Sequence, residues 1–201
     1  MKKYIWVAFA IVFISLFIYW VYNLPNEEVL STPDEVYLVI GDNSFNDSTL
    51  AILEENLIYL SLDIIKEYID PNIFYDENEQ MIIITNDKEV ARYVVNENCA
   101  SVNHREFYLD NPVKEVESSI YIPDDILTRH YDLNIAYWEN TNTITVDDLN
   151  SNYILGQVIL EGGDIRVSFD KKAPIIFKDV PVETELYVFE EYEDWYKVRT
   201  I

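Results

Sequence analysis

The most reactive side chains in this sequence are one cysteine, Cys99, and two histidines, His104 and His130. A thiol hydrolase needs its cysteine within hydrogen-bond reach of an imidazole base. His104 falls in a predicted hairpin turn, and His130 falls on the apolar face of a predicted helix, where packing explains it better than catalysis. One cysteine and two histidines do not make a convincing zinc site. We therefore expect no catalytic residues and no metal ligands.

Acidic residues occur as adjacent pairs, a pattern that glycoside hydrolysis does not use. A glycosidase needs two carboxylates that face each other across a cleft, one of them with a raised pKa. Neighbouring acids in turns and at helix starts do not provide that arrangement, and the D-x-x-D-x-D-x-E signature of chitinase-like glycosidases is absent. We interpret these acids as solvated surface. The pairs are Glu27-Glu28, Glu54-Glu55, Asp124-Asp125, Asp147-Asp148 and Glu190-Glu191.

Two acidic stretches, Asp42–Asp47 and Asp76–Gln80, are similar in composition to calcium loops. Neither has the glycine at position six and the glutamate at position twelve that an EF-hand requires. Loose calcium binding by the acidic surface stays open. With four glycines the chain has no glycine-rich phosphate loop, so we expect no cofactor.

The charge of the chain excludes one large class of partners. Its 201 residues include 14 basic and 37 acidic side chains, for a formal net charge of -23. Such an excess of acid repels nucleic acid phosphates and anionic membrane surfaces, although it can also serve only to keep the protein soluble. The single cysteine cannot form an internal disulfide, which is compatible with export from a bacterium.

An internal repeat organises the middle of the chain. Residues Ile58–Thr85 align without a gap with Ile120–Asp147, and eleven of the twenty-eight aligned positions are identical. Self-similarity of this kind indicates one supersecondary unit built twice, each copy burying the apolar face of the other. The same offset also predicts a hairpin at the start of each half, because it aligns Ile40 with Val102 and Phe45 with Phe107.

Each copy predicts a strand, a helix and a hairpin, in that order. A short β-like run leads to Ser61 in the first copy and to Pro123 in the second, both suited to a helix start. Apolar residues then recur at helical spacing. Two short strands joined by an asparagine-containing turn complete each copy. The β-like runs are Leu57–Leu60 and Ser119–Ile122.

The repeats carry the motif of a known family. The best matches are Tyr121-Ile122-Pro123, Ala136-Tyr137-Trp138-Glu139 and Ile144-Thr145-Val146. In these runs the sequence resembles the copper amine oxidase N-terminal-like domain, also called the stalk domain. The resemblance implies an α+β domain of two repeats over residues 36–149. In that family the domain is a non-catalytic spacer without copper ligands, so the resemblance implies no cofactor.

The segment after residue 149 predicts a small all-β domain over residues 150–201. Short strands at close spacing without a helical run indicate a barrel or a sandwich. Gly162-Gly163 is expected to join the first two strands as a tight hairpin. The predicted strands are Tyr153–Leu160, Asp164–Phe169, Ala173–Phe177, Glu185–Tyr192 and Trp195–Ile201.

This last segment is similar to bacterial SH3 domains in Ile165-Arg166-Val167, in Thr184–Val188 and above all in Trp195-Tyr196-Lys197-Val198-Arg199. The resemblance implies an SH3-like barrel, incomplete here because the family continues with a further turn and strand; we expect a fragment. Barrels of this kind bind ligands with aromatic residues on one face. Strand alternation places Trp195 and Tyr196 on opposite faces, so at most one lines such a groove. The candidate ligand-binding residues are Tyr187, Tyr192, Trp195 and Tyr196.

The N-terminus predicts one transmembrane helix. Residues 4–22 carry no charge, have aromatic residues near both ends and follow Lys2 and Lys3, which should stay cytoplasmic. A cleaved signal peptide is the rival interpretation, but no small-x-small cleavage site follows the apolar run. We predict a signal anchor over residues 1–22 that contacts the lipid bilayer through residues 4–22. The polar segment 23–35 predicts a linker.

Together these features predict a single-pass cell-membrane protein with most of its chain outside the cytoplasm. Its expected role is to position a protein at the bacterial cell wall by binding peptidoglycan or another glycan. The resemblances imply that a chitinase-like glycoside hydrolase domain could follow Ile201. The alternative is a purely structural or adhesive surface protein with no enzymatic domain.

Overall fold

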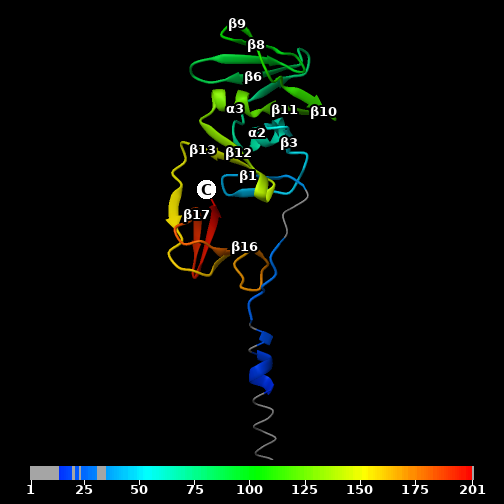
Figure 1. The fold of residues 1–201 in the computed structure, drawn as a ribbon. Coiled ribbons are helices and arrows are strands. Elements are labelled where there is room, and N and C mark those ends of the chain that lie inside the picture. Colours follow the sequence, from blue (N-terminus) through cyan, green and yellow to red (C-terminus); the bar gives the residue numbers. More distant parts are fainter. Residues whose placement is uncertain (1–13, 20, 23, 31–34, 201) are drawn as a thin grey trace, which may run out of the picture. The chain divides into compact units, whose positions relative to one another are not determined.

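The computed structural model describes residues 14–19, 21–22, 24–30 and 35–200. The chain divides into two compact units. We call residues 32–152 the central unit, and residues 1–31 with 153–201 the terminal unit. In sequence, the central unit is therefore an insertion between two parts of the terminal unit (Figure 1).

The central unit consists of two halves with the same order of elements, and one extra strand, β7 (Val90–Val94), lies between them. The first half contains β1 (Tyr37–Ile40), β2 (Asn43–Phe45), β3 (Ala51–Glu54), β4 (Leu57–Ser61), α2 (Leu62–Tyr68), β5 (Phe74–Asp76) and β6 (Met81–Thr85). The second contains β8 (Cys99–Val102), β9 (Arg105–Tyr108), β10 (Lys114–Val116), β11 (Ser119–Pro123), α3 (Asp124–His130), β12 (Leu133–Trp138), a 3-10 turn η1 (Glu139–Thr141) and β13 (Thr143–Asp148). The predicted repeat, with its opening hairpins, is confirmed.

Both helices begin where the sequence predicts. Ser61 is the N-cap of α2, and its side chain accepts a hydrogen bond from the backbone N–H of Ile64. Pro123 takes the same position before α3, with an extended backbone and φ of -71°. Each helix is only seven residues long. The central unit is thus mostly β, with few and short helices. The α+β domain that the sequence predicted therefore contains less helix than strand.

A central four-stranded sheet joins the halves symmetrically. In its strand order, β10-β11-β4-β3, the equivalent strands β11 and β4 pair at the centre, and the equivalent strands β10 and β3 lie at the two edges. In the β4 and β11 ladder, Leu60 lies opposite Ile122, and the flanking pairs are Ser61 with Tyr121 and Tyr59 with Pro123. Because residues 60 and 122 are equivalent in the repeat, the halves are related by a pseudo-two-fold axis at this pair. This is the isologous arrangement of a symmetric dimer, here within one chain.

The outer sheets exchange strands between the halves. In the sheet β12-β13-β1-β2, strand β13 of the second half pairs in parallel with β1 of the first. The other outer sheet, β5-β6-β7-β8-β9, has the equivalent order with β7 added between β6 and β8. The inserted strand, which does not belong to the repeat, therefore makes one outer sheet a strand wider than the other.

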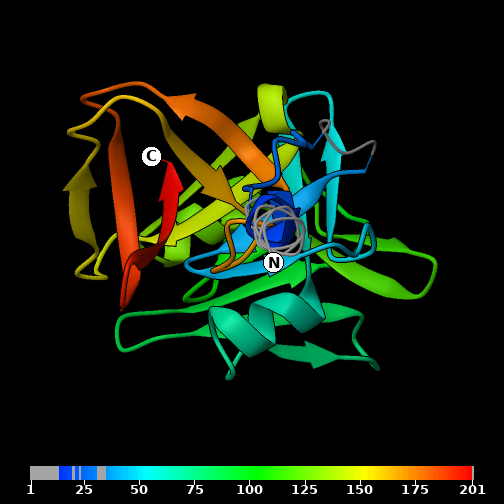
Figure 2. The ribbon, with the colours of Figure 1, turned by 90° about the horizontal axis from the view of Figure 1, so that it is seen from below.

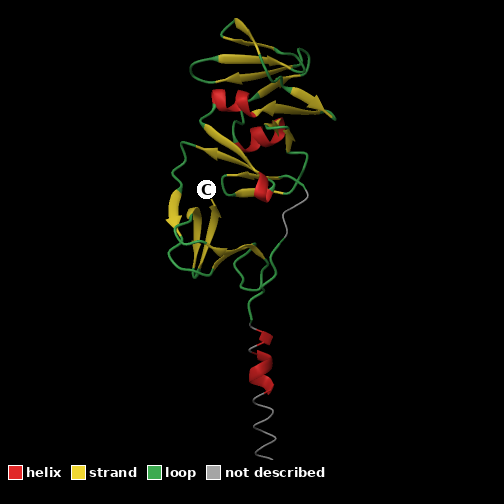
Figure 3. Ribbon diagram, viewed as in Figure 1, coloured by secondary structure: helices red, strands yellow, loops and turns green. Residues whose placement is uncertain are grey.

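The helices lie between the sheets of the central unit (Figure 3). One buried hydrophobic cluster extends through both halves, from Leu38 on β1 to Val146 on β13. Leu60 and Ile122 are fully buried within it. The two copies therefore share a single core, as the sequence repeat predicted.

Among its described residues, the terminal unit contains five strands close to the predicted runs. They are β14 (Ile154–Gln157), β15 (Gly163–Arg166), β16 (Ile175–Val180), β17 (Glu185–Tyr192) and β18 (Trp195–Thr200). Strands β14, β17 and β18 form one sheet, in that order, and β15 and β16 form another (Figure 2).

The predicted hairpin at Gly162-Gly163 is wrong. Strand β14 pairs with β17, not with β15. The pairing continues past the strand end, where the N–H of Val158 donates to Thr184 O. The aromatic ring of Tyr153 packs on Tyr187 at 4.8 Å, so the side chains at the start of this run find their partners on β17. Gly162 does adopt a left-handed φ of 78°.

The polar segment predicted as a linker makes specific contacts that the sequence did not indicate. Residues 26–30 lie beside β16, with a parallel bridge from Val29 to Ile175. The N–H of Leu30 donates to Ile175 O, and the N–H of Ile175 donates to Glu28 O. This part of the segment belongs to the terminal unit, because its backbone hydrogen bonds join it to β16.

The predicted membrane anchor lies only partly within the described residues. Residues 14–19 and 21–22 are helical, and their side chains are exposed. Within the described stretches of chain, no helix has the length and apolar character needed to cross a bilayer. The anchor at residues 4–22 stays a prediction.

Candidate functional site

Strands β17 and β18 bring three of the four predicted ligand-binding residues onto one face. Tyr192 pairs with Trp195, and Tyr187 pairs with Arg199. Directly opposite residues of an antiparallel pair share a face, and positions 195 and 199 share one by alternation. Tyr187 and Tyr192 are five positions apart, which in a regular strand would place them on opposite faces. The register shift between Val188 and Glu190 brings them onto the same face.

Further rings extend this face. Phe189 and Tyr153 contact Tyr187, with ring centroids 6.4 Å and 4.8 Å away. The guanidinium of Arg199 lies 5.3 Å from the Tyr187 ring centre, within range of a cation–π contact. We call Tyr153, Phe169, Tyr187, Phe189, Tyr192, Trp195 and Arg199 the aromatic face.

The outer end of the aromatic face is accessible to solvent. Phe169 stacks on Tyr192 with ring centroids 4.9 Å apart and planes at 12°. Tyr192 is 57% exposed and Phe169 is 45% exposed. Two nearly parallel rings open to water offer a stacking surface for a flat or ring-shaped ligand.

Tyr196 does not belong to this face. It pairs with Glu191, one position away from the Tyr192 and Trp195 pair, and therefore points to the other side of the sheet. Its hydroxyl donates to Glu191 Oε1 at 3.4 Å. The structure thus separates Tyr196 from Trp195, as alternation predicted. A ligand-binding role of the four residues stays a prediction.

Sequence reasoning missed Tyr153, Phe169 and Phe189. Tyr153 and Phe169 lie in runs that were predicted as strands but could not be assigned neighbours. Phe189 lies at the register shift, so that simple alternation counted back from Tyr192 would place it on the other face. For Phe189 the recoverable signal is the density of aromatic residues in residues 187–196; Tyr153 and Phe169 lie outside that stretch.

The central unit buries a polar cluster around His130. The hydroxyl of Tyr93 and His130 Nε2 form a hydrogen bond, and His130 Nδ1 lies 2.8 Å from Glu89 Oε1. The His130 side chain is fully buried, as its place on the apolar helix face predicted. Burial lowers the pKa of His130, an effect that the hydrogen bond and charge of Glu89 partly offset. Burial also raises the pKa of Tyr93 to about 12.

The other reactive groups do not converge. Cys99 is the first residue of β8, and His104 lies in the turn after the other end of that strand, with a left-handed φ of 68°. Both ring nitrogens of His130 are hydrogen-bonded, one to Tyr93 and the other to Glu89. Among the described residues, no group of three or more histidine, cysteine or acidic side chains is placed to hold a metal ion.

The acidic stretches act locally as turn residues. Asp47 Oδ1 accepts hydrogen bonds from the backbone and hydroxyl of Thr49. Asp76 Oδ1 accepts from the N–H groups of Asn78 and Glu79. These are the side-chain hydrogen bonds typical of Asx turns. In each aspartate, the Oδ1 atom that a calcium loop would use as a ligand already accepts hydrogen bonds from the turn.

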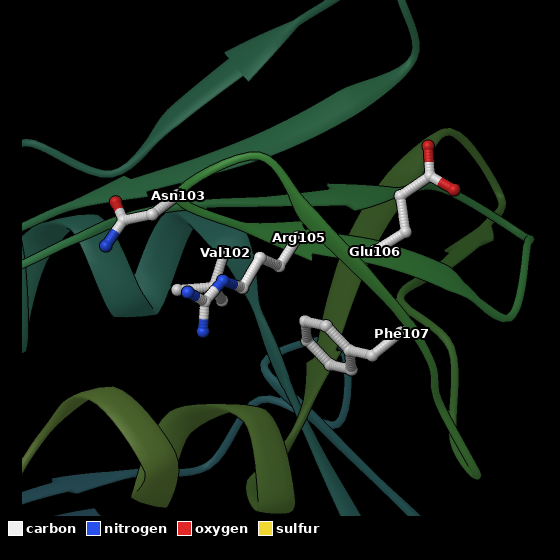
Figure 4. A pocket seen from close by; sticks show the side chains of 5 residues that line it. All are labelled: Val102, Asn103, Arg105, Glu106 and Phe107. Carbon is white, nitrogen blue, oxygen red and sulfur yellow. The ribbon is translucent and has the colours of Figure 1, made fainter.

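A shallow hollow opens beside the β8 and β9 hairpin. Its lining residues are Val102, Asn103, Arg105, Glu106 and Phe107. In Figure 4, the side chains of Arg105 and Phe107 extend from β9 towards the helices, whereas the Glu106 carboxylate points away. The Asn103 amide is engaged by backbone groups, since its Oδ1 accepts from the N–H of Val90.

Comparison with known proteins gives one match. The family model described as copper amine oxidase N-terminal domain matches residues 39–146. That range covers both halves of the repeat from β1 to β13. No curated protein and no solved structure matches the chain.

Proposed function

Because the chain belongs to the copper amine oxidase N-terminal domain family, whose domain is a non-catalytic, stalk-like module, we propose that it positions a protein at the bacterial cell wall. In this proposal the central unit is the spacer. The terminal unit is an SH3-like module that supplies the binding surface. The shared core of the two halves suits a spacer, since a single cooperative core resists partial opening.

The aromatic face is the observation that carries the binding role. Exposed rings such as Tyr192 and Phe169 can stack on the apolar faces of sugar rings, while tyrosine hydroxyls offer hydrogen bonds to the sugar oxygens. A neutral or weakly charged glycan also avoids the repulsion that a chain with a net charge of -23 exerts on polyanions. The ligand class we propose is peptidoglycan or a related wall glycan.

Co-sedimentation with purified peptidoglycan tests this binding. The whole chain, held in mild detergent, should pellet with the glycan at moderate salt. Tyr192→Ala and Trp195→Ala should each weaken binding about three- to tenfold, the range expected for losing one stacked ring. Tyr196→Ala is the matched control, because it removes a tyrosine from the opposite face of the same sheet. Equal losses in all three variants, or no pelleting at all, would refute the role of this face.

The remaining parts of the proposal concern the ends of the sequence. Residues 4–22 anchor the chain in the cell membrane with the N-terminus in the cytoplasm, supported by their uncharged, apolar composition. Resistance of membrane-bound protein to alkaline carbonate extraction would agree with an integral helix; release would contradict it.

We further propose that the chain serves a chitinase-like glycoside hydrolase, as its resemblances imply. Reading the gene past codon 201 decides this point. A continuation of several hundred residues with clustered acids in a barrel pattern would agree, and a stop codon would favour a structural or adhesive surface protein.

A further inference from the structure

The two halves of the central unit differ in the aromatic contact between their second strand and the end of their helix. In the first half, Phe45 on β2 contacts Tyr68 at the end of α2, with ring centroids 5.1 Å apart. The equivalent residues of the second half are Phe107 on β9 and His130 at the end of α3. There the contact is indirect, because Tyr93 lies between them, 6.5 Å from Phe107 and 5.7 Å from His130.

The inserted strand β7 explains this difference. It carries Tyr93 and separates β8 and β9 from β6 by one additional strand, a displacement of about 4.8 Å. Val102, which aligns with the buried Ile40, is accordingly only partly buried and lines the hollow beside β9. The first half has no added strand, so its Phe45 closes directly on the helix. The hollow is thus a feature of the second half.

One arginine of the second half lines this hollow, and a second lies beside the Phe107 ring that also lines it. Arg105 extends into it next to Phe107 (Figure 4). The guanidinium of Arg129, from the last turn of α3, lies 5.2 Å from the centre of the same ring. The first half has Asn43 and Glu67 at the equivalent positions. The two positive charges beside the hollow therefore have no counterpart at the equivalent positions of the first half.

Neither guanidinium forms an ion pair with a carboxylate of the residues that the structure describes. Within the described part of the chain, the ion pairs involve other cations, namely Lys114, His130, Arg166 and Lys178. The nearest carboxylate in sequence, that of Glu106, points away from Arg105 (Figure 4). In a chain with 37 acidic residues, two arginines that make no ion pair among the described residues lie beside one aromatic ring, where a carboxylate from outside the chain could pair with them.

We propose that this hollow binds the carboxylate of a ligand whose apolar body packs on Phe107. A guanidinium presents a planar fork of N–H donors that matches a carboxylate, and the ring supplies an apolar surface for the atoms next to it. The site takes either the carboxylate of a peptide or that of an acidic sugar. It lies in the central unit and is independent of the aromatic face.

Nuclear magnetic resonance titration of the whole chain tests this site with two pairs of probes. The first pair is N-acetylphenylalanine and its amide, and the second is benzyl glucuronide and benzyl glucoside. We expect backbone signals of residues 102–107 to shift with a carboxylate probe and not with its neutral counterpart. The pair that shows this difference identifies the source of the carboxylate. No shift with either carboxylate, or equal shifts with a neutral probe, would overturn the proposal.

The repeat supplies the variants. Arg105→Asn and Arg129→Glu introduce the residues that the first half has at the equivalent positions, so both variants should fold. Each should weaken carboxylate binding about tenfold or more, because a charge-assisted hydrogen bond is lost. The control is Arg92 on β7, which lies between the buried Ala91 and Tyr93 and so points to the opposite face of the sheet. Arg92→Asn and Arg92→Glu should leave binding within about twofold. Equal losses in the control would mean that only net charge matters, which would contradict the site.

Discussion

His130 shows how one substitution within a repeat changes the chemistry of a buried position. Its equivalent, Tyr68, makes a ring contact with Phe45, whereas His130 bridges Tyr93 and Glu89. The helical pattern predicted that His130 would be packed. Its partners could not be predicted, because Glu89 and Tyr93 lie in the segment between the repeats, for which the alignment offers no counterpart.

The lowered pKa of His130 predicts a pH dependence of stability. Desolvation lowers the folded-state pKa below the ordinary value of 6.5, so the unfolded chain protonates this imidazole first. Stability should therefore decrease as the pH falls from 6.5 towards the folded-state pKa. We expect the urea midpoint to decrease between about pH 7.5 and about pH 5.5, and to decrease less in His130→Gln, which has no titrating group in this range.

Other groups that face His130 also act on its protonation. Glu89 stabilises the charged imidazole, whereas Arg129 and burial disfavour it. Tyr131, whose ring lies 6.4 Å away, donates its hydroxyl to Asp70 Oδ2 at 2.6 Å, and burial raises its pKa further. The tyrosines therefore stay neutral throughout this range. An equal decrease in the wild type and in His130→Gln would assign the effect to other groups.

At the scale of elements, the sequence predicted the content of each half better than the pairing between them. Strand, helix and hairpin followed from local spacing and from turn residues such as Ser61 and Pro123. Strand pairing depends on contacts between distant segments, which periodicity does not encode. For this reason the repeat predicted neither the exchange of β13 with β1 nor the place of β7 in the wider sheet.

The pair on the pseudo-two-fold axis predicts strong coupling between the halves. Leu60 and Ile122 are fully buried and directly opposite. Leu60→Ala and Ile122→Ala should each lower the free energy of unfolding by about 2–5 kcal/mol, because each leaves a cavity in the shared core. Urea denaturation should show a single transition for the central unit in both variants.

A double substitution provides a second test of this coupling. Because Leu60 and Ile122 are cross-strand partners, the effect of the double variant should differ from the sum of the single effects by about 0.5 kcal/mol or more. Val116→Ala is the control; this residue is on β10 of the same sheet and is 37% exposed, so its effect should stay within about 0.5 kcal/mol. Additive effects and separate transitions would show that the halves fold independently.

At the scale of the whole molecule, Arg166 joins segments that are far apart in sequence. Its Nη1 donates to Asn26 O at 2.7 Å and to Ala173 O at 2.8 Å, and its Nη2 donates to Asp164 Oδ2 at 3.1 Å. The side chain is 7% exposed. The polar composition of residues 23–35 predicted a linker because composition describes local preference and says nothing about a partner 140 residues away.

Loss of Arg166 should release the segment that it holds. In Arg166→Met, the amide protons of Leu30 and Ile175, which bond across the same pairing, should exchange about tenfold faster or more, since charge-assisted hydrogen bonds to two carbonyls are lost. Lys178→Met is the control, because it removes only the partly exposed ion pair with Glu27, and its effect should remain below about fivefold. Equal acceleration in both variants would contradict the role of Arg166.

The pairing of residues 26–30 with β16 also determines how the molecule responds to tension. A pull between residues 24 and 200 acts first on the backbone bonds that join Glu28 and Leu30 to Ile175. The whole of residues 32–152 lies between those two attachment points in sequence and bears no load while the bonds hold. The inserted unit thus begins to stretch only after the hydrogen bonds between residues 26–30 and β16 have broken. Rupture of this pairing at low force would protect the core of the central unit from unfolding.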